Sequence, residues 1–157
     1  MIKVKRLGHL LLRVSDLKKS LTFYCDTLGF ELVERGGEQH KQTAFLSLGD
    51  IYPRTGGSGH TVDLVEVGNA KLASSSRSTL HHFALQVDSF NDLREAYFEL
   101  VDGNIGVIKA TNHVTQKSIF IKDPDGNIVE IYYELPNALE MFRAGRGDND
   151  EVLTFYR

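Results

Sequence analysis

An internal repeat is the feature that most constrains how this chain can fold. Two short segments, Gly8–Val14 and His81–Val87, share one alternating pattern, and the step from His9 to His82 is 82 − 9 = 73 residues. In each segment every second residue is apolar, which is typical of a half-buried strand. Repetition at a fixed step indicates a duplicated structural unit.

The same step continues into the segment after each strand. Apolar residues at helical spacing run from Leu17 to Leu28 and again from Leu93 to Val101. Each predicted helix has polar residues able to cap its start and a glycine able to end it: Ser15 or Asp16 with Gly29, and Ser89 or Asn91 with Gly103. Each half therefore begins with a strand and then a helix.

Three strand-like runs come after each helix. They cover about Gly29–Glu34, Thr43–Leu48 and Thr61–Val67 in the first half, and about Gly106–Ala110, Ser118–Lys122 and Ile128–Glu134 in the second. The last pair aligns Asp63 with Glu130, a step of 130 − 63 = 67, so the first half carries a longer loop, the glycine-rich 49–59. The sequence thus predicts an α+β fold of two tandem βαβββ modules.

The predicted organisation has four parts: a first module at 1–67, a linker at 68–79, a second module at 80–135 and a C-terminal extension at 136–157. A short helix is expected over Asn137–Ala144, and the tail Gly145–Arg157 receives no element. One module alone would bury too little surface to be stable, so we expect the two copies to pack together.

Composition excludes several classes of function. The formal net charge is −3 with no basic stretch, so neither a nucleic acid nor a membrane is expected as a partner. The chain has one cysteine, Cys25, which excludes an intrachain disulfide and indicates a reducing compartment. No apolar run approaches the roughly 20 residues that span a bilayer. These features together predict a cytoplasmic protein.

Three polar residues fall at related points of the repeat. In an alternating strand His9 and His82 point away from the apolar face, whereas His81 is expected to point the other way; Glu130 occupies the last strand of the second half. Imidazole and carboxylate suit Fe²⁺, Mn²⁺, Ni²⁺ or Zn²⁺, and two histidines with one carboxylate leave positions open for substrate. Hydrogen-bonded structural residues are the alternative interpretation.

The chain resembles the vicinal oxygen chelate superfamily, which includes glyoxalases, fosfomycin- and bleomycin-resistance proteins and extradiol dioxygenases. The segments that carry the resemblance are Leu7–Val14, Phe23–Phe30, His81–Val87 and Asp123–Glu130. The resemblance covers roughly residues 5–135 and implies paired βαβββ modules that curl around a metal-bearing cavity. It also implies that His9, His82 and Glu130 are the metal ligands.

The resemblance offers roles to three further residues. Asp63 stands where glyoxalase-like members carry a fourth metal ligand, usually Glu. The alternative interpretation is that Asp63 is an ordinary polar residue at a strand end. By similarity to extradiol dioxygenases, His60 is the acid–base residue and His113 contacts the substrate. Strict alternation would turn His60 away from Asp63 unless the strand begins after it. Phe120 stands where the extradiol pattern has a tyrosine.

The resemblance supports three hypotheses. The leading one is an extradiol-type dioxygenase that acts on a catechol-like vicinal diol with Fe²⁺. The second is a glyoxalase-type isomerase or lyase with Ni²⁺ or Zn²⁺, and Mn²⁺ also fits the ligand set. The third is a resistance-type protein that binds a small molecule without catalysis. Relatives that pair modules between chains make a homodimer an alternative to a monomer.

Overall fold

The structure is a computed structural model that describes residues 7–36, 42–48, 60–68, 80–145 and 150–157. Two compact units make up the chain, Met1–Ser78 and Thr79–Arg157. The predicted glycine loop at 49–59, and all of the predicted linker except Gly68, lie outside the described residues. Each unit has its own sheet and is described by itself.

The first unit contains a four-stranded mixed sheet. Its elements are β1 (Leu10–Val14), α1 (Leu17–Leu21), η1 (Thr22–Thr27), β2 (Glu31–Arg35), β3 (Thr43–Ser47) and β4 (Val62–Glu66). The strand order is β1-β4-β3-β2, with β1 parallel to β4 and the other pairs antiparallel. Of the alternating apolar residues predicted for the first strand, Leu12 and Val14 are buried and Leu10 is half-buried.

The first helix is shorter than the sequence predicts. Asp16 caps it by accepting a hydrogen bond from the Lys19 amide at 3.0 Å, and the Glu66 carboxylate accepts from the Leu17 amide at 2.8 Å. After five residues the α-helix widens into the π-helical turn η1. The adjacent residues Phe23 and Tyr24 are both buried in this turn; the apolar spacing predicts the burial of Tyr24 but not that of Phe23.

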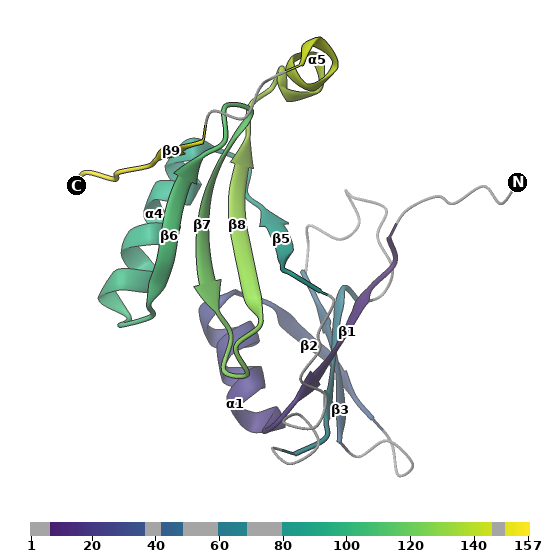
Figure 1. Cartoon of the computed structure of the whole chain (residues 1–157). Coiled ribbons are helices and arrows are strands. Elements are labelled where there is room, and N and C mark those ends of the chain that lie inside the picture. Colours follow the sequence, from purple (N-terminus) through teal and green to yellow (C-terminus); the bar gives the residue numbers. More distant parts are fainter. Residues whose placement is uncertain (1–6, 37–41, 49–59, 69–79, 146–149) are drawn as a thin grey trace, which may run out of the picture. The chain divides into compact units, whose positions relative to one another are not determined.

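The second unit contains a five-stranded mixed sheet. Its elements are β5 (Phe83–Gln86), α4 (Phe90–Asp102), β6 (Val107–Asn112), β7 (Gln116–Lys122), β8 (Ile128–Glu134), α5 (Ala138–Ala144) and β9 (Glu151–Val152). The strand order is β5-β8-β7-β6-β9, and α4 lies beside β6, β7 and β8 (Figure 1). The short helix expected in the extension is present, and the unassigned tail supplies β9.

Strand register confirms the duplication. Leu11 pairs with Asp63 across β1 and β4, and Ala84 pairs with Glu130 across β5 and β8. On the other side, Phe45 pairs with Asp63 and Phe120 with Glu130. The predicted α+β fold of two βαβββ modules is therefore confirmed. The metal-bearing cavity that goes with it stays a prediction.

The faces of each sheet differ in chemistry. The second unit's core face includes Ile119, Ile121, Val129 and Ile131, which are buried together with Leu93 and Leu100 of α4. The other face of this sheet carries polar residues, among them Ser118 and Glu130, because side chains alternate along a strand. No helix in the described parts of the chain is long and apolar enough to cross a membrane.

Candidate functional site

Asp63 is the centre of a polar cluster in the first unit. Its carboxylate is almost fully buried on β4, with Oδ1 2.5 Å from His60 Nδ1 and Oδ2 3.7 Å from His9 Nε2. The His9 and His60 rings lie 4.6 Å apart. Since an ionised carboxylate can only accept, the His60 Nδ1–H donates to Asp63. The candidate acid–base residue and the candidate fourth ligand are thus direct partners.

His60 reaches Asp63 because it precedes the strand. β4 begins at Val62, so alternation does not govern the side chain of His60. The Thr61 amide donates to the Leu46 carbonyl at 2.7 Å and ties this approach to β3, and the Phe45 ring lies 5.4 Å from the His60 ring. The prediction from strict alternation, that His60 points away from Asp63, is therefore wrong. The alternative, that the strand begins after His60, is confirmed.

The second unit holds a histidine–carboxylate pair at the equivalent position. His82 Nε2 lies 3.0 Å from Glu130 Oε2, and Glu130 is buried on β8. The other oxygen, Oε1, accepts hydrogen bonds from Ser118 Oγ at 2.5 Å and Gln116 Nε2 at 3.0 Å. Both donors stand on β7. They fix the carboxylate so that Oε2 is the oxygen turned to His82.

His81 does not point away from its neighbour as alternation predicts. Its Nδ1 lies 2.6 Å from Nδ1 of His82, and the two rings meet nearly edge to face. Both residues precede β5, which begins at Phe83, so the strand's alternation does not govern the direction of either side chain. In this contact one of the two nitrogens donates and the other accepts.

The two pairs have the chemistry of metal ligands. Imidazole nitrogen and carboxylate oxygen are ligands that Fe²⁺, Mn²⁺, Ni²⁺ and Zn²⁺ accept. The ligand atoms of His9, His60 and Asp63 all lie within 4.8 Å of one another. Of the three predicted ligands, His82 and Glu130 are neighbours. That His9 binds the same ion as this pair stays a prediction. The hydrogen bonds to Glu130 are support of the kind that metal ligands carry.

His113 lies on the turn between β6 and β7. Its Nδ1 is 2.9 Å from Asp150 Oδ1, and only 15% of its side chain is exposed. The buried Phe120 ring is 6.2 Å from the ring of His113 and 5.8 Å from that of His82. Phe120 therefore lies close to both candidate residues, on the strand opposite Glu130.

Tyr132 contributes a hydroxyl group to the polar face of β8. Burial, followed by the nearby Glu134 and Glu130 carboxylates, raises the pKa of its phenol above the ordinary value. The hydroxyl lies 3.5 Å from Gln86 Oε1 and donates to it as a neutral group. Phe120 lacks the hydroxyl of the extradiol pattern, and Tyr132 and Tyr24 are the tyrosines that the sequence offers in its place; Tyr24 is fully buried in the first unit's core. It is therefore a packing residue.

A comparison with family models decides the family. The model described as the Glyoxalase/Bleomycin resistance protein/Dioxygenase superfamily matches residues 6–131. The chain belongs to this superfamily. The resemblance drawn from the repeated histidine segments and the Asp123–Glu130 turn is thereby confirmed.

Relatives similar to this chain carry names of different activities. Catechol-2,3-dioxygenase of Bacillus subtilis is 27% identical over 135 residues, covering 84% of this chain but only 42% of that protein. A probable lactoylglutathione lyase of Vibrio cholerae is 32% identical over 133 residues, covering 80% of this chain and 88% of that protein. The chain thus spans less than half of the dioxygenase and most of the lyase.

Solved structures agree on the fold. The fosfomycin resistance protein FosX of Listeria monocytogenes matches with a TM-score of 0.65 at 18% identity, over 87% of this chain and 98% of that one. Lactoylglutathione lyase of Agrobacterium tumefaciens matches with a TM-score of 0.62 at 21% identity, over 83% and 95%. At these identities the likeness concerns the fold.

Sequence reasoning missed the residues that hold the candidate side chains. Gln116 and Ser118 lie four and two residues before Phe120, so they share its face of β7, the strand that pairs with Glu130. The antiparallel register could therefore have identified them. The pairing of His113 with Asp150 has no comparable signal, because Asp150 lies in a polar tail without a periodic pattern.

Proposed function

We propose that this chain is a metal-dependent oxygenase of the extradiol type, acting on a catechol-like vicinal diol. His9, His82 and Glu130 are the proposed ligands, and Fe²⁺ is the proposed ion. Two histidine–carboxylate contacts at equivalent points of the repeat carry the proposal: His9 with Asp63, and His82 with Glu130. The Asp63 carboxylate also binds His60.

The ligand assignment rests on how each residue is held. Glu130 is buried, and two hydrogen bonds occupy its Oε1, so Oε2 is the oxygen available beside His82 Nε2. His9 occupies the same repeat position as His82. A bound divalent ion would supply Lewis acidity, which lowers the pKa of a coordinated substrate hydroxyl.

His60 is the proposed acid–base residue. Asp63 accepts from its Nδ1–H, which leaves Nε2 with the lone pair in the neutral ring. A substrate hydroxyl placed at Nε2 could then lose its proton to His60, while Asp63 stabilises the resulting imidazolium. His113 is the proposed substrate contact of the second unit.

Metal content of the purified protein tests the ligand set. We expect one divalent ion per chain under reducing conditions, lost in His9→Ala, His82→Ala and Glu130→Gln. Glu134→Gln removes a carboxylate from a position further along the same strand and should leave the ion bound. An ion that survives His82→Ala but leaves in His60→Ala would place it on His9, His60 and Asp63 and contradict the assignment.

Oxygen consumption tests the reaction. With Fe²⁺-loaded protein and a panel of substituted catechols, we expect O₂ uptake together with the absorbance of a ring-opened product. His60→Ala should keep the metal and lower kcat by about 10²–10⁴-fold, the usual contribution of a positioned acid–base group. Stoichiometric metal without O₂ uptake on any catechol would reject the oxygenase.

A glyoxalase-type lyase is the second candidate, and one contact favours it. Asp63 Oδ2 faces His9 Nε2 at 3.7 Å, at the position where lyase-like members carry a fourth ligand. In that case Asp63→Asn should lower metal affinity as strongly as Glu130→Gln, with Ni²⁺ or Zn²⁺ as the ion. Formation of lactoylglutathione in the absence of O₂ would support the lyase over the oxygenase.

A further inference from the structure

The end of the chain is built into the second unit's sheet. β9 pairs antiparallel with β6, matching Val152 with Thr111 and Glu151 with Asn112, and the Leu153 amide donates to the Ala110 carbonyl at 3.1 Å. These residues lie beyond 6–131, the part that the superfamily model matches. The extra strand is therefore an addition to the matched region of the fold.

Aromatic and charged contacts fasten the segment after β9 to α4. The Phe155 ring stacks on Tyr97 at 4.6 Å and on Phe90 at 5.9 Å. Arg157 pairs with Asp102, and its guanidinium lies 5.0 Å from the Phe98 ring centre. Stacked rings and cation–π contacts of this kind add to the backbone pairing. Residues 151–157 thus have several independent attachments.

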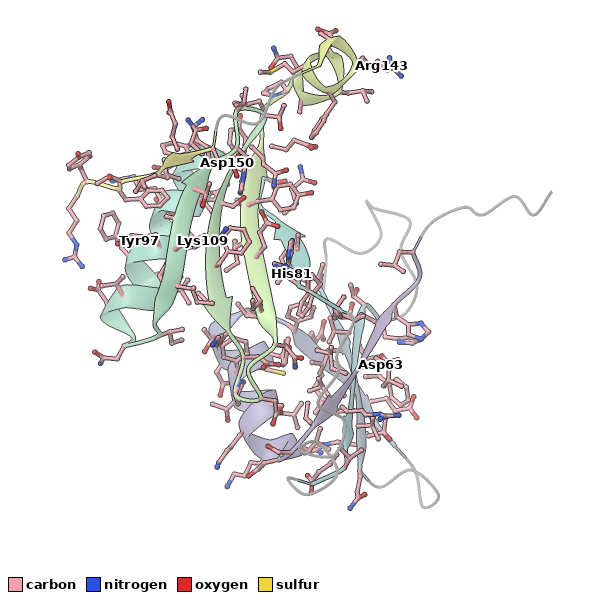
Figure 2. All side chains as sticks on the ribbon, viewed as in Figure 1. Asp63, His81, Tyr97, Lys109, Arg143 and Asp150 are labelled. Atoms are coloured by element: carbon pink, nitrogen blue, oxygen red, sulfur yellow. The ribbon has the colours of Figure 1, made fainter. Side chains whose placement is uncertain are left out.

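This attachment places Asp150 against His113. Asp150 comes directly before β9, at the edge of the sheet where β9 joins it (Figure 2). Its Oδ1 lies 2.9 Å from His113 Nδ1, and His113 is mostly buried whereas Asp150 is about half exposed. Because the carboxylate only accepts, this contact selects the ring form that carries its proton on Nδ1 and leaves Nε2 without one.

The backbone around His113 is also tightly determined. Val114 has a φ of 65°, a left-handed conformation that is a genuine outlier for a β-branched residue. The His113 amide donates to the Gln116 carbonyl at 2.8 Å, and the Thr115 amide donates to the His113 carbonyl at 2.7 Å. Strained residues persist where their surroundings over-determine them, and they cluster at functional sites. The turn therefore holds His113 in a defined place beside Phe120.

We propose that Asp150 is a positioning residue, through which the C-terminal segment fixes His113 in its Nδ1-protonated form. The role of His113 toward a substrate rests on the proposed function. His113 Nε2 then accepts a hydrogen bond from a substrate hydroxyl, while the acid–base role stays with His60.

The first test is the tautomer of His113, which needs neither metal nor substrate. In protein labelled with ¹⁵N-histidine, the His113 ring signals are assigned by their loss in His113→Gln. Wild type should show a protonated Nδ1 and an unprotonated Nε2. Asp150→Ala should give a mixture of the two neutral forms, and Asp150→Glu should restore the wild-type pattern. Glu151→Ala, the matched control, removes the next carboxylate and should change nothing.

The second test is kinetic. If His113 acts on the substrate, Asp150→Ala should lower kcat by about 10- to 100-fold with little change in KM, as is usual when a group that orients a functional residue is lost. Asp150→Glu should recover part of the rate. Equal losses in Asp150→Ala and Glu151→Ala would mean that the segment is merely structural and would overturn the proposal.

The two proposals fail in different ways. An Nδ1-protonated His113 that persists in Asp150→Ala overturns the positioning role, whatever the protein catalyses. A wild type that turns over no catechol rejects the oxygenase, and the ¹⁵N spectra then decide on Asp150 by themselves.

Discussion

Glu130 shows how much of the candidate site depends on single atoms. Its Oε1 receives two hydrogen bonds from β7, and its Oε2 faces His82. The neighbours of a ligating carboxylate typically change metal affinity by about 10- to 100-fold. The hydroxyl of Ser118, which gives the shorter of the two bonds at 2.5 Å, should therefore matter although it touches no substrate.

We expect Ser118→Ala to weaken metal binding by about 10- to 100-fold while the fold is kept. The reason is that Glu130 would lose the donor that holds Oε1 and would sample other orientations. Competition with a chelator of known affinity measures the change. Ser47→Ala, which removes another buried serine hydroxyl on β3, is the control. Equal affinities in Ser118→Ala and wild type would contradict a supporting role.

Tyr132 should affect how stability depends on pH. Its pKa is raised in the folded protein by burial and then by Glu134 and Glu130. The folded state therefore holds the phenolic proton more tightly than the unfolded state, so its contribution is present below the unfolded pKa of about 10 and is lost as pH rises through the folded pKa. The free energy of unfolding should fall in that range.

Denaturant unfolding of wild type and Tyr132→Phe at several pH values isolates this effect. Above about pH 10 the wild type should lose stability more steeply than Tyr132→Phe. Tyr156→Phe replaces a tyrosine that is 78% exposed and should follow the wild-type slope. Parallel curves for wild type and Tyr132→Phe would contradict the prediction.

At the residue scale, alternation correctly predicted that His82 points away from the apolar face, where it meets Glu130, but it gave the wrong directions for His60 and His81. Alternation gives facing only inside a strand, and His60, His81 and His82 all stand one or two residues before a strand begins. Their contacts with Asp63, Glu130 and each other are set by how the chain enters the strand. No pattern of residue types in the sequence encodes that entry.

Among the elements, α4 is the helix with the clearest sequence signals. The Ser89 hydroxyl accepts from the Asp92 amide at 3.1 Å, which resolves the choice between Ser89 and Asn91 as the capping residue. The Asn91 side chain instead donates to Glu95 on the exposed surface, at 2.7 Å. A helix has unpaired amides at its start, so the cap satisfies a donor that would otherwise need water.

Ser89→Ala should lower the free energy of unfolding by about 1 kcal/mol. Asn91→Ala removes two exposed side-chain hydrogen bonds, with Glu95 and Arg94, and should lower it by a smaller amount, because such pairs on a helix surface contribute about 0.2–0.5 kcal/mol each. Chemical denaturation of the two variants measures the difference. Equal effects of the two substitutions would mean that the Ser89 hydroxyl does not cap α4.

The strands were predictable where one face is buried and alternation is long. β8 runs from Ile128 to Glu134 as the pattern predicts, because its apolar residues alternate over seven positions. β9 could not be predicted, since two exposed residues, Glu151 and Val152, carry no periodicity and depend on an edge that β6 provides. The π-helical η1 was likewise not predicted, since the spacing of apolar residues from Leu17 to Leu28 indicates a continuous α-helix.

For the whole molecule, the duplicated architecture was the most predictable property. A repeat is recognised by a step that holds within each matched stretch, here 73 residues at the first strands and 67 at the last. The register shows that Leu64 and Ile131, 131 − 64 = 67 residues apart, occupy the same place in their sheets. Leu64 lies between Leu12 and Ala44, and Ile131 lies between Leu85 and Ile119. Both are buried. Every one of these strand partners belongs to the same unit as the residue it flanks.

This arrangement predicts that core damage stays local. Leu64→Ala and Ile131→Ala each remove buried methyl groups, and such substitutions cost about 2–5 kcal/mol. Because the strand partners of each residue lie in its own sheet, Leu64→Ala should speed amide hydrogen exchange in β1, β3 and β4 more than in β5, β7 and β8. Ile131→Ala should do the reverse, as read by mass spectrometry of peptides from each strand. If either substitution raised exchange equally in both sheets, the two units would unfold as one cooperative body, and the boundary between them would have no energetic meaning.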